Sequence, residues 1–300
     1  DYQPIGGTPA YQREVQNLVF GVDCEPAAAQ AIVNVQSLGG TGALRIGADY
    51  LHRLYPDSVV YVSNPTWENH RQIFAQAGFR VADYPYYSHE LGGVDFEHML
   101  HFLQHEVAEK SIVVLHACCH NPSGADLSES QWRQLGQVVK ARRLIALLDL
   151  AYQGFGESPS ADAYAPRLFA KLGLQFLVAT SFSKSFSLYG ERVGALSVVA
   201  DHADEATRIT SHLKRIIRTA YSYPPIHGGA LVASVLADPA LRAQWEQELG
   251  EMRGRIHAMR QALVSALAAR HCPLNLPSIA GQRGIFAFTG LTPAQVKTLQ

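Results

Sequence analysis

The sequence predicts an α/β protein whose large domain has three layers, with a mostly parallel sheet between two layers of helices. Short apolar runs recur along the first two thirds of the chain, separated by amphipathic stretches long enough for helices. The apolar runs are nearly continuous, which is typical of parallel strands that are covered on both faces. After Ala200 the pattern becomes almost purely helical, and a very long helical run there predicts a link to a second, smaller domain.

Composition excludes several classes of partner. The chain has 300 residues, of which 47% are hydrophobic and 17% charged, as in an ordinary globular protein of one or two domains. Its net charge is -1 with both signs interspersed, so neither nucleic acid nor an anionic membrane surface is expected as a partner. No apolar run is long enough for a membrane helix, and the first residues of the sequence lack the pattern of a signal peptide. Cysteines are too sparse for a disulfide framework, which predicts a cytoplasmic protein.

Helices and strands alternate through the first half of the chain. A helix is expected up to Phe20, and residues 28–35 are apolar, where a helix end gives way to a short strand. A glycine-rich turn then opens an amphipathic helix within 38–51. Further strands are expected at 58–63, 79–84, 111–117 and 144–148, and further helices at 68–77, 96–109, 129–142 and 161–172.

The second half begins with strands at 176–180 and 193–200 and continues as helices. The helices are expected at 204–220, 226–236 and 239–270. The last of them exceeds the usual globular length, so we expect it to link two domains. A strand at 283–288 and a helix capped by Thr292 follow. The predicted domains are a large domain, 1–245, and a linking helix with part of a small domain, 246–300.

Candidate site residues follow the predicted strands, because ligands of an open parallel sheet bind outside the carboxyl ends of its strands. The segments in these places are Asn64-Pro-Thr-Trp67, His120-Asn-Pro-Ser-Gly124, Asp149-Leu-Ala-Tyr152 and Ser181-Phe-Ser-Lys184, with Arg192 further on. The turn Gly39–Gly42 opens a helix, whose free N–H groups and dipole favour an anion. All these residues are expected at one edge of the sheet.

Each candidate also has a structural interpretation. Lys184 lies between two apolar strands, where burial lowers the pKa of an amine and makes it nucleophilic, but it could be a loop lysine facing water. Asp149 emerges from a buried strand and needs a cationic partner, or it caps a turn. Trp67 belongs to the core or lies flat on a planar ligand. Asn121 and the glycine turn could both be simple turns.

A cluster of histidines and cysteines at the end of the predicted strand 111–117 suggests a metal site. It consists of His116, Cys118, Cys119 and His120. Structural zinc sites place two or more residues between paired cysteines, and adjacent residues of an extended segment point to opposite sides. We therefore expect no metal here, but buried small residues and a histidine with its hydrogen bonds satisfied.

Taken together, the candidates indicate pyridoxal phosphate. This cofactor needs a lysine for its aldehyde, an acid for its pyridine nitrogen, an anion pocket and an aromatic platform. Lys184 supplies the amine and Asp149 the acid. Tyr152 and Asn121 can donate hydrogen bonds to the ring oxygen. Trp67 supplies the platform. The phosphate ligands expected at the helix N-terminus are Thr41, Ser181 and Arg192.

Several long motifs resemble class I aminotransferases of the aspartate aminotransferase family. They are Asn64-Pro-Thr-Trp-Glu-Asn69, Cys118-Cys-His-Asn-Pro-Ser-Gly124, Asp149-Leu-Ala-Tyr-Gln-Gly154, Ser181-Phe-Ser-Lys184 and Leu188-Tyr-Gly-Glu-Arg192. The amino-acid sequences of Leu38–Leu44 and Phe186–Arg192 resemble the bacterial aromatic (tyrosine) branch of the family more than the aspartate branch. The resemblance runs essentially end to end.

The resemblance implies a fold-type-I pyridoxal-phosphate enzyme that transfers the amino group of tyrosine or phenylalanine to 2-oxoglutarate and also accepts aspartate. An aspartate-preferring enzyme is the alternative. The resemblance also implies that Lys184 forms a Schiff base and transfers protons, that Trp67 stacks on the cofactor ring, and that Gly40 binds the phosphate. It also implies a homodimer with shared active sites. The residues that would act there are Tyr2 and Ser222 at the cofactor, and Tyr2, Arg218, Trp67 and Asn121 at the substrate.

Two departures from the family pattern and three rival functions stay open. Relatives extend further at both ends, so the resemblance implies an incomplete small α/β domain here and places the arginine that binds the substrate α-carboxylate beyond Gln300. Tyr223 stands where relatives carry a small polar residue. The rivals are a lyase or decarboxylase on the same cofactor, a nucleotide-binding oxidoreductase using Gly39–Gly42, and an inactive binding protein.

Overall fold

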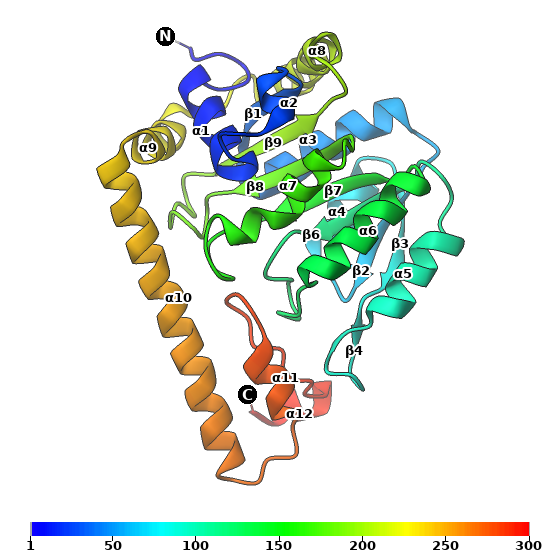
Figure 1. Cartoon of the computed structure of the whole chain (residues 1–300), viewed down its shortest axis with the longest axis vertical. Coiled ribbons are helices and arrows are strands. Elements are labelled where there is room, and N and C mark those ends of the chain that lie inside the picture. Colours follow the sequence, from blue (N-terminus) through cyan, green and yellow to red (C-terminus); the bar gives the residue numbers. More distant parts are fainter. Residues whose placement is uncertain (1, 300) are drawn as a thin grey trace.

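A seven-stranded sheet forms the centre of the computed structural model, which describes residues 2–299 (Figure 1). Asp1 and Gln300, the outer limits of the expected domains, lie outside the described residues. The strand order is β1-β9-β8-β7-β6-β2-β3. The strands are β1 (Ile32–Leu38), β2 (Val59–Asn64), β3 (Arg80–Pro85), β6 (Ile112–His116), β7 (Ile145–Leu150), β8 (Phe176–Ser181) and β9 (Val193–Val199). Only β9 runs against the other strands of this sheet, which confirms the mostly parallel prediction.

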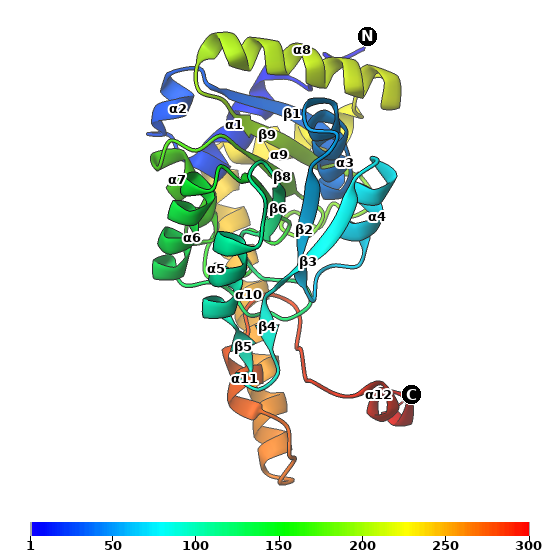
Figure 2. The ribbon, with the colours of Figure 1, turned by 90° about the vertical axis from the view of Figure 1, so that its right-hand side faces the viewer.

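Helices cover both faces of the sheet, as the continuous apolar strands predict. The helices of the large body are α1 (Pro9–Phe20), α2 (Glu25–Ala28), α3 (Gly39–Leu54), α4 (Asn69–Gln76), α5 (Phe96–His105), α6 (Glu129–Ala141), α7 (Tyr164–Lys171), α8 (Ala203–Ala220) and α9 (Ile226–Ala237). Every residue of β6, β8 and β9 is buried. The predicted three layers are therefore present (Figure 2).

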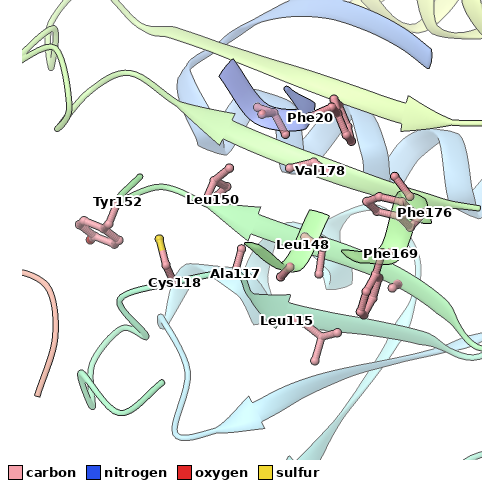
Figure 3. Packing of buried hydrophobic residues seen from close by; sticks show 14 of the residues in the cluster. Phe20, Leu115, Ala117, Cys118, Leu148, Leu150, Tyr152, Phe169, Phe176 and Val178 are labelled. Carbon is pink, nitrogen blue, oxygen red and sulfur yellow. The ribbon is translucent and has the colours of Figure 1, made fainter. Parts of the chain in front are cut away.

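Alternate residues of the central strands enter two separate cores. Leu148 and Val178 belong to the core under α1, α6 and α7, where Figure 3 shows them with Phe20 and Phe169. Leu147, the neighbour of Leu148, belongs instead to the core under α3 and α8. This alternation is the two-residue period of a strand, and it fixes which side chains of each strand end can face a ligand.

A long helix, α10 (Pro239–Ala268), leads away from the sheet to α11 (Leu276–Gly281) and α12 (Pro293–Leu299), as Figures 1 and 2 show. Asp238 caps α10 by accepting from the backbone N–H groups of Ala240 and Leu241, with Pro239 in the first turn. The expected long helix is present, 30 residues in length. Among residues 2–299, no helix has both the length and the apolar character required to cross a bilayer.

The expected strand at 283–288 is wrong. Gly284 has a φ of +78°, and the segment pairs with no strand among the described residues. Its carbonyl groups accept hydrogen bonds from a side chain, because the guanidinium of Arg260 contacts the carbonyls of Gln282, Gly284 and Phe286. A small hairpin that the sequence analysis missed, β4 (Tyr87–Ser88) with β5 (Gly93–Val94), lies beside α11.

Candidate active site

A cavity of about 230 Å³ lies at the carboxyl ends of β2, β6, β7 and β8, beside the first turn of α3. The residues that line it are Gly40, Thr41, Leu44, Trp67, His116, Asn121, Asp149, Ala151, Tyr152, Ser181, Ser183, Lys184, Tyr189 and Arg192. This one cavity therefore brings together the site residues that were predicted at the strand ends and in the glycine turn. A larger hollow of about 710 Å³ lies between α6 and α7, but no residue of these strand ends lines it.

Strand register explains why these side chains meet. His116, Asp149 and Ala179 are direct neighbours across β6, β7 and β8. The three strands run in parallel and therefore end at the same edge, where the residues that follow them gather. On the other side, Ser181 pairs with Gly194 of β9, which places the chain around Arg192 beside the same edge.

Asp149 is the buried acid of the site, only 5% exposed. His70 Nε2 donates to its Oδ2 over 3.0 Å, and His70 Nδ1 lies 2.8 Å from the hydroxyl of Thr66, from which it can accept. Burial alone would raise the pKa of Asp149, but the hydrogen bond from His70 and the favourable electrostatic interactions with His70, His116 and Lys184 outweigh it and lower the pKa. The group is therefore a carboxylate, as a cationic ligand would require.

His70 was missed by the sequence analysis. It lies in the first turn of α4, is fully buried, and packs edge-on against Trp67 with ring centroids 5.3 Å apart. The signal was its spacing, because a residue three positions after Trp67 at a helix start lies on the same face. Ser183 and Tyr189 also line the cavity and were not among the expected site residues.

Lys184 is half-buried, with Nζ 4.9 Å from the centroid of the Tyr152 ring. Burial lowers the pKa of Lys184, Asp149 partly opposes this, and the positive charge of Arg192 adds to the lowering. Burial also raises the pKa of Tyr152 to about 12, with a further contribution from the charge of Asp149. The site thus combines an amine that deprotonates more readily than usual with a phenol that stays a hydrogen-bond donor.

The other end of the cavity is built for an anion. Gly40 and Thr41 lie in the first turn of α3, and a Cβ on Gly40 would come within 3.0 Å of Cβ of Ser181. Gly39 has a φ of +69°, and a Cβ there would lie 2.5 Å from Nη2 of Arg192. Among the described residues, no carboxylate lies within 4.0 Å of Arg192, whose Nη1 donates to the carbonyl of Tyr189 over 3.0 Å. Helix dipole, hydroxyls and guanidinium therefore converge without a counter-ion.

The expectation for the His116–His120 cluster is half right. His120 is satisfied, with Nε2 2.9 Å from the hydroxyl of Ser63 and Nδ1 2.7 Å from that of Ser123. Both ring nitrogens of His116 are buried without a partner in the described structure. The argument that the thiols of Cys118 and Cys119 point apart is wrong, because Cys119 has a φ of +51° and the two sulfurs lie within 4.8 Å of each other.

Burial and the neighbouring His70 lower the pKa of His116 to about 3 from its ordinary 6.5. Between these values the unfolded chain binds a proton at this position that the folded chain rejects, so stability falls as the pH falls. We expect acidification of the cofactor-free protein from pH 7 to pH 5 to cost the wild type about 2 kcal/mol more than His116→Gln. Urea unfolding at the two pH values measures this, and equal losses would contradict it.

Tyr2, Arg218 and Ser222 do not line the cavity. Tyr2 is 81% exposed, and its ring packs against that of Tyr223 with centroids 4.5 Å apart. Arg218, in the last turn of α8, donates to the hydroxyl of Ser222. These four residues form one surface group, separate from the cavity of the same chain.

Comparison with known proteins agrees with this geometry. A family model described as "Aminotransferase class I and II" matches residues 1–300. The aspartate aminotransferase of Pseudomonas aeruginosa is 53% identical over 299 residues, and the aromatic-amino-acid aminotransferase of Escherichia coli 49%. Each alignment covers 100% of this chain and 75% of the relative.

A solved structure of an aminotransferase has the same fold as this chain. The crystal structure of the aromatic-amino-acid aminotransferase of Burkholderia pseudomallei, covalently bound to pyridoxal phosphate, superposes with a TM-score of 0.98 at 57% identity. The match covers 100% of this chain and 75% of that one. Model match, identity and fold lead to one conclusion: the chain belongs to the class I and II aminotransferase family.

Proposed function

We propose that this aminotransferase passes the amino group of tyrosine or phenylalanine to 2-oxoglutarate and also accepts aspartate. The enzyme class and its cofactor, pyridoxal phosphate, follow from the family. The observation that carries the proposal is a single cavity with a readily deprotonated lysine between a buried carboxylate and an anion cradle. Relatives named for both substrate classes support dual specificity, and an aspartate-preferring enzyme remains compatible.

The residues present fit this cofactor. The glycine cradle of α3 has no room for a Cβ, and Arg192 beside it lacks a carboxylate partner among residues 2–299. These features suit a phosphate bound by Gly40, Thr41, Ser181 and Arg192. Asp149, held as a carboxylate, suits a protonated ring nitrogen at the far end of the cavity.

The roles of the side chains follow from this geometry. When bound, pyridoxal phosphate supplies an electron sink. Lys184 would hold the cofactor until the substrate amine displaces it. The freed, neutral Nζ would then take the proton from the substrate Cα and deliver it to the cofactor carbon that is bonded to the substrate nitrogen. Tyr152 and Asn121 donate hydrogen bonds toward the ring oxygen, and Trp67 forms the flat wall against the ring. Asp149, oriented by His70, keeps the charge of the ring nitrogen.

The surface group formed by Tyr2, Arg218, Ser222 and Tyr223 supports a homodimer with shared sites. The exposed guanidinium of Arg218, the exposed phenol of Tyr2 and the partly buried phenol of Tyr223 lie outside their own cavity and can complete the cavity of a second subunit. Arg218 then binds the distal carboxylate of 2-oxoglutarate or aspartate and moves aside for an aromatic ring.

We further propose that the chain consists of a large domain, 1–245, and a linking helix with part of a small domain, 246–300. We also propose a cytoplasmic location, because the four cysteines are free thiols.

Arg218→Leu tests the function and the substrate role together. In full-length protein, the half-reaction with aspartate should slow by about 30-fold or more, because a desolvated carboxylate loses its charged partner. The half-reaction with phenylalanine should change much less. Absorbance of the bound cofactor in single turnovers measures each half-reaction separately.

Arg215→Leu, an exposed change about one turn earlier on α8, is the matched control and should leave both half-reactions unchanged. Equal losses with aspartate and phenylalanine would disprove the role of Arg218. Incubating wild-type protein with tyrosine and 2-oxoglutarate must also yield glutamate. A lyase or decarboxylase forms none, and an oxidoreductase requires a nicotinamide cofactor.

A further inference from the structure

Arg260 is a buried charge on α10 that lies outside the active-site cavity. Its side chain is only 6% exposed. Nη1 donates to the carbonyl of Gln282 over 2.7 Å, and Nη2 donates to the carbonyls of Phe286, over 2.9 Å, and Gly284. No carboxylate among residues 2–299 lies within 4.0 Å of it. Burying a guanidinium is costly, so its carbonyl partners hold both the charge and the segment 282–286 in place.

The segment 282–286 packs against Tyr152, which lines the active-site cavity, and against the loop 119–124. The backbone N–H of Arg283 donates to the carbonyl of Gly124 over 2.7 Å. Gly284 lies so close to Cys119 that a Cβ on the glycine would come within 2.6 Å of the Cβ of the cysteine. The ring of Phe286 meets that of Tyr152 edge-on, with centroids 5.6 Å apart.

These contacts converge on Tyr152 and Asn121. Asn121 belongs to the loop 119–124, which the segment touches at both ends, and its Nδ2 lies 3.5 Å from the Tyr152 hydroxyl. The edge contact of Phe286 limits the tilt of the Tyr152 ring, and the bond to Gly124 limits movement of the loop. We propose that Arg260 is a positioning residue, which sets the orientation of Tyr152 and Asn121 toward the cofactor through the segment 282–286.

This inference rests on the proposed roles of Tyr152 and Asn121, and its test separates the two. The readout is the pH at which the visible absorbance of the bound cofactor changes, because hydrogen bonds to the ring oxygen alter the proton affinity of the cofactor. We expect Arg260→Met in full-length holoenzyme to shift this midpoint by about half a pH unit or more. The shift should have the same sign as that of Tyr152→Phe.

Two comparisons distinguish positioning from general stability. Arg253→Met removes another arginine of α10, which donates to the carbonyl of Gly154 over 2.7 Å, and should leave the midpoint unchanged. Arg260→Lys keeps the charge but lacks the planar fork that reaches three carbonyls, so it should restore the midpoint only in part. Phe286→Leu removes the edge contact while Arg260 stays in place, and it should shift the midpoint even if Arg260→Met fails to fold.

The outcomes are distinct. A wild-type midpoint in folded Arg260→Met or in Phe286→Leu, with a shifted midpoint in Tyr152→Phe, overturns the inference and leaves the proposed function intact. An unshifted midpoint in Tyr152→Phe overturns the role of Tyr152 and with it the inference. An equal shift in Arg253→Met would assign the effect to α10 as a whole and overturn the role of Arg260.

Discussion

Lys184→Ala should abolish transamination, with turnover falling by about 10⁴-fold or more, because one side chain supplies both the covalent anchor and the proton-transferring base. Burial and Arg192 lower the pKa of Lys184, so a neutral amine is available at a pH where a surface lysine would be charged. Borohydride treatment followed by peptide mapping should fix pyridoxal phosphate to Lys184 in the wild type and to no residue in the variant.

Lys184→Arg is the matched control for charge. A guanidinium keeps the positive charge beside Asp149 but does not deprotonate in proteins, so this variant should be as inactive as Lys184→Ala. Activity close to wild type in Lys184→Arg would show that the site uses only the charge. Cofactor fixed at any other lysine would disprove the assignment of Lys184.

The sequence was sufficient to predict the strand ends and the cavity they form. Lys184, Asp149 and Asn121 each directly follow or closely succeed a continuous apolar run, and a parallel sheet brings such positions to one edge whatever the details of packing. The anion site in the first turn of α3 was predictable for a local reason, because a glycine-rich stretch that opens a helix leaves free N–H groups for an anion.

Features that depend on contacts between distant segments were not predictable. His70 becomes part of the site only through its hydrogen bond to Asp149, a residue 79 positions away. The segment 283–288 has the pattern of a strand, yet two of its carbonyl groups, those of Gly284 and Phe286, accept hydrogen bonds from Arg260 and not from a neighbouring strand. The thiols of Cys118 and Cys119 share one side because Cys119 adopts a positive φ, which residue type alone does not indicate.

Asp149→Asn should lower turnover by roughly 100- to 5,000-fold, the effect of about 3–5 kcal/mol for removing one partner of a buried charge pair. The amide keeps the shape of the side chain but not the negative charge, so nothing retains the proton on the ring nitrogen. The hydrogen bond from His70 Nε2 can still be accepted by the amide oxygen, which keeps the local structure. Steady-state assays at saturating cofactor measure this loss.

Asp162→Asn is the control that separates charge at the ring from burial of a carboxylate. Asp162 is also buried, but it accepts from the backbone N–H groups of Gly154, Gly156 and Glu157, outside the cavity. Its replacement should lower the thermal midpoint while turnover of the folded protein stays within about tenfold of wild type. If both variants lost turnover equally, Asp149 would act by holding the fold. A much larger loss for Asp149→Asn assigns its charge to the chemistry.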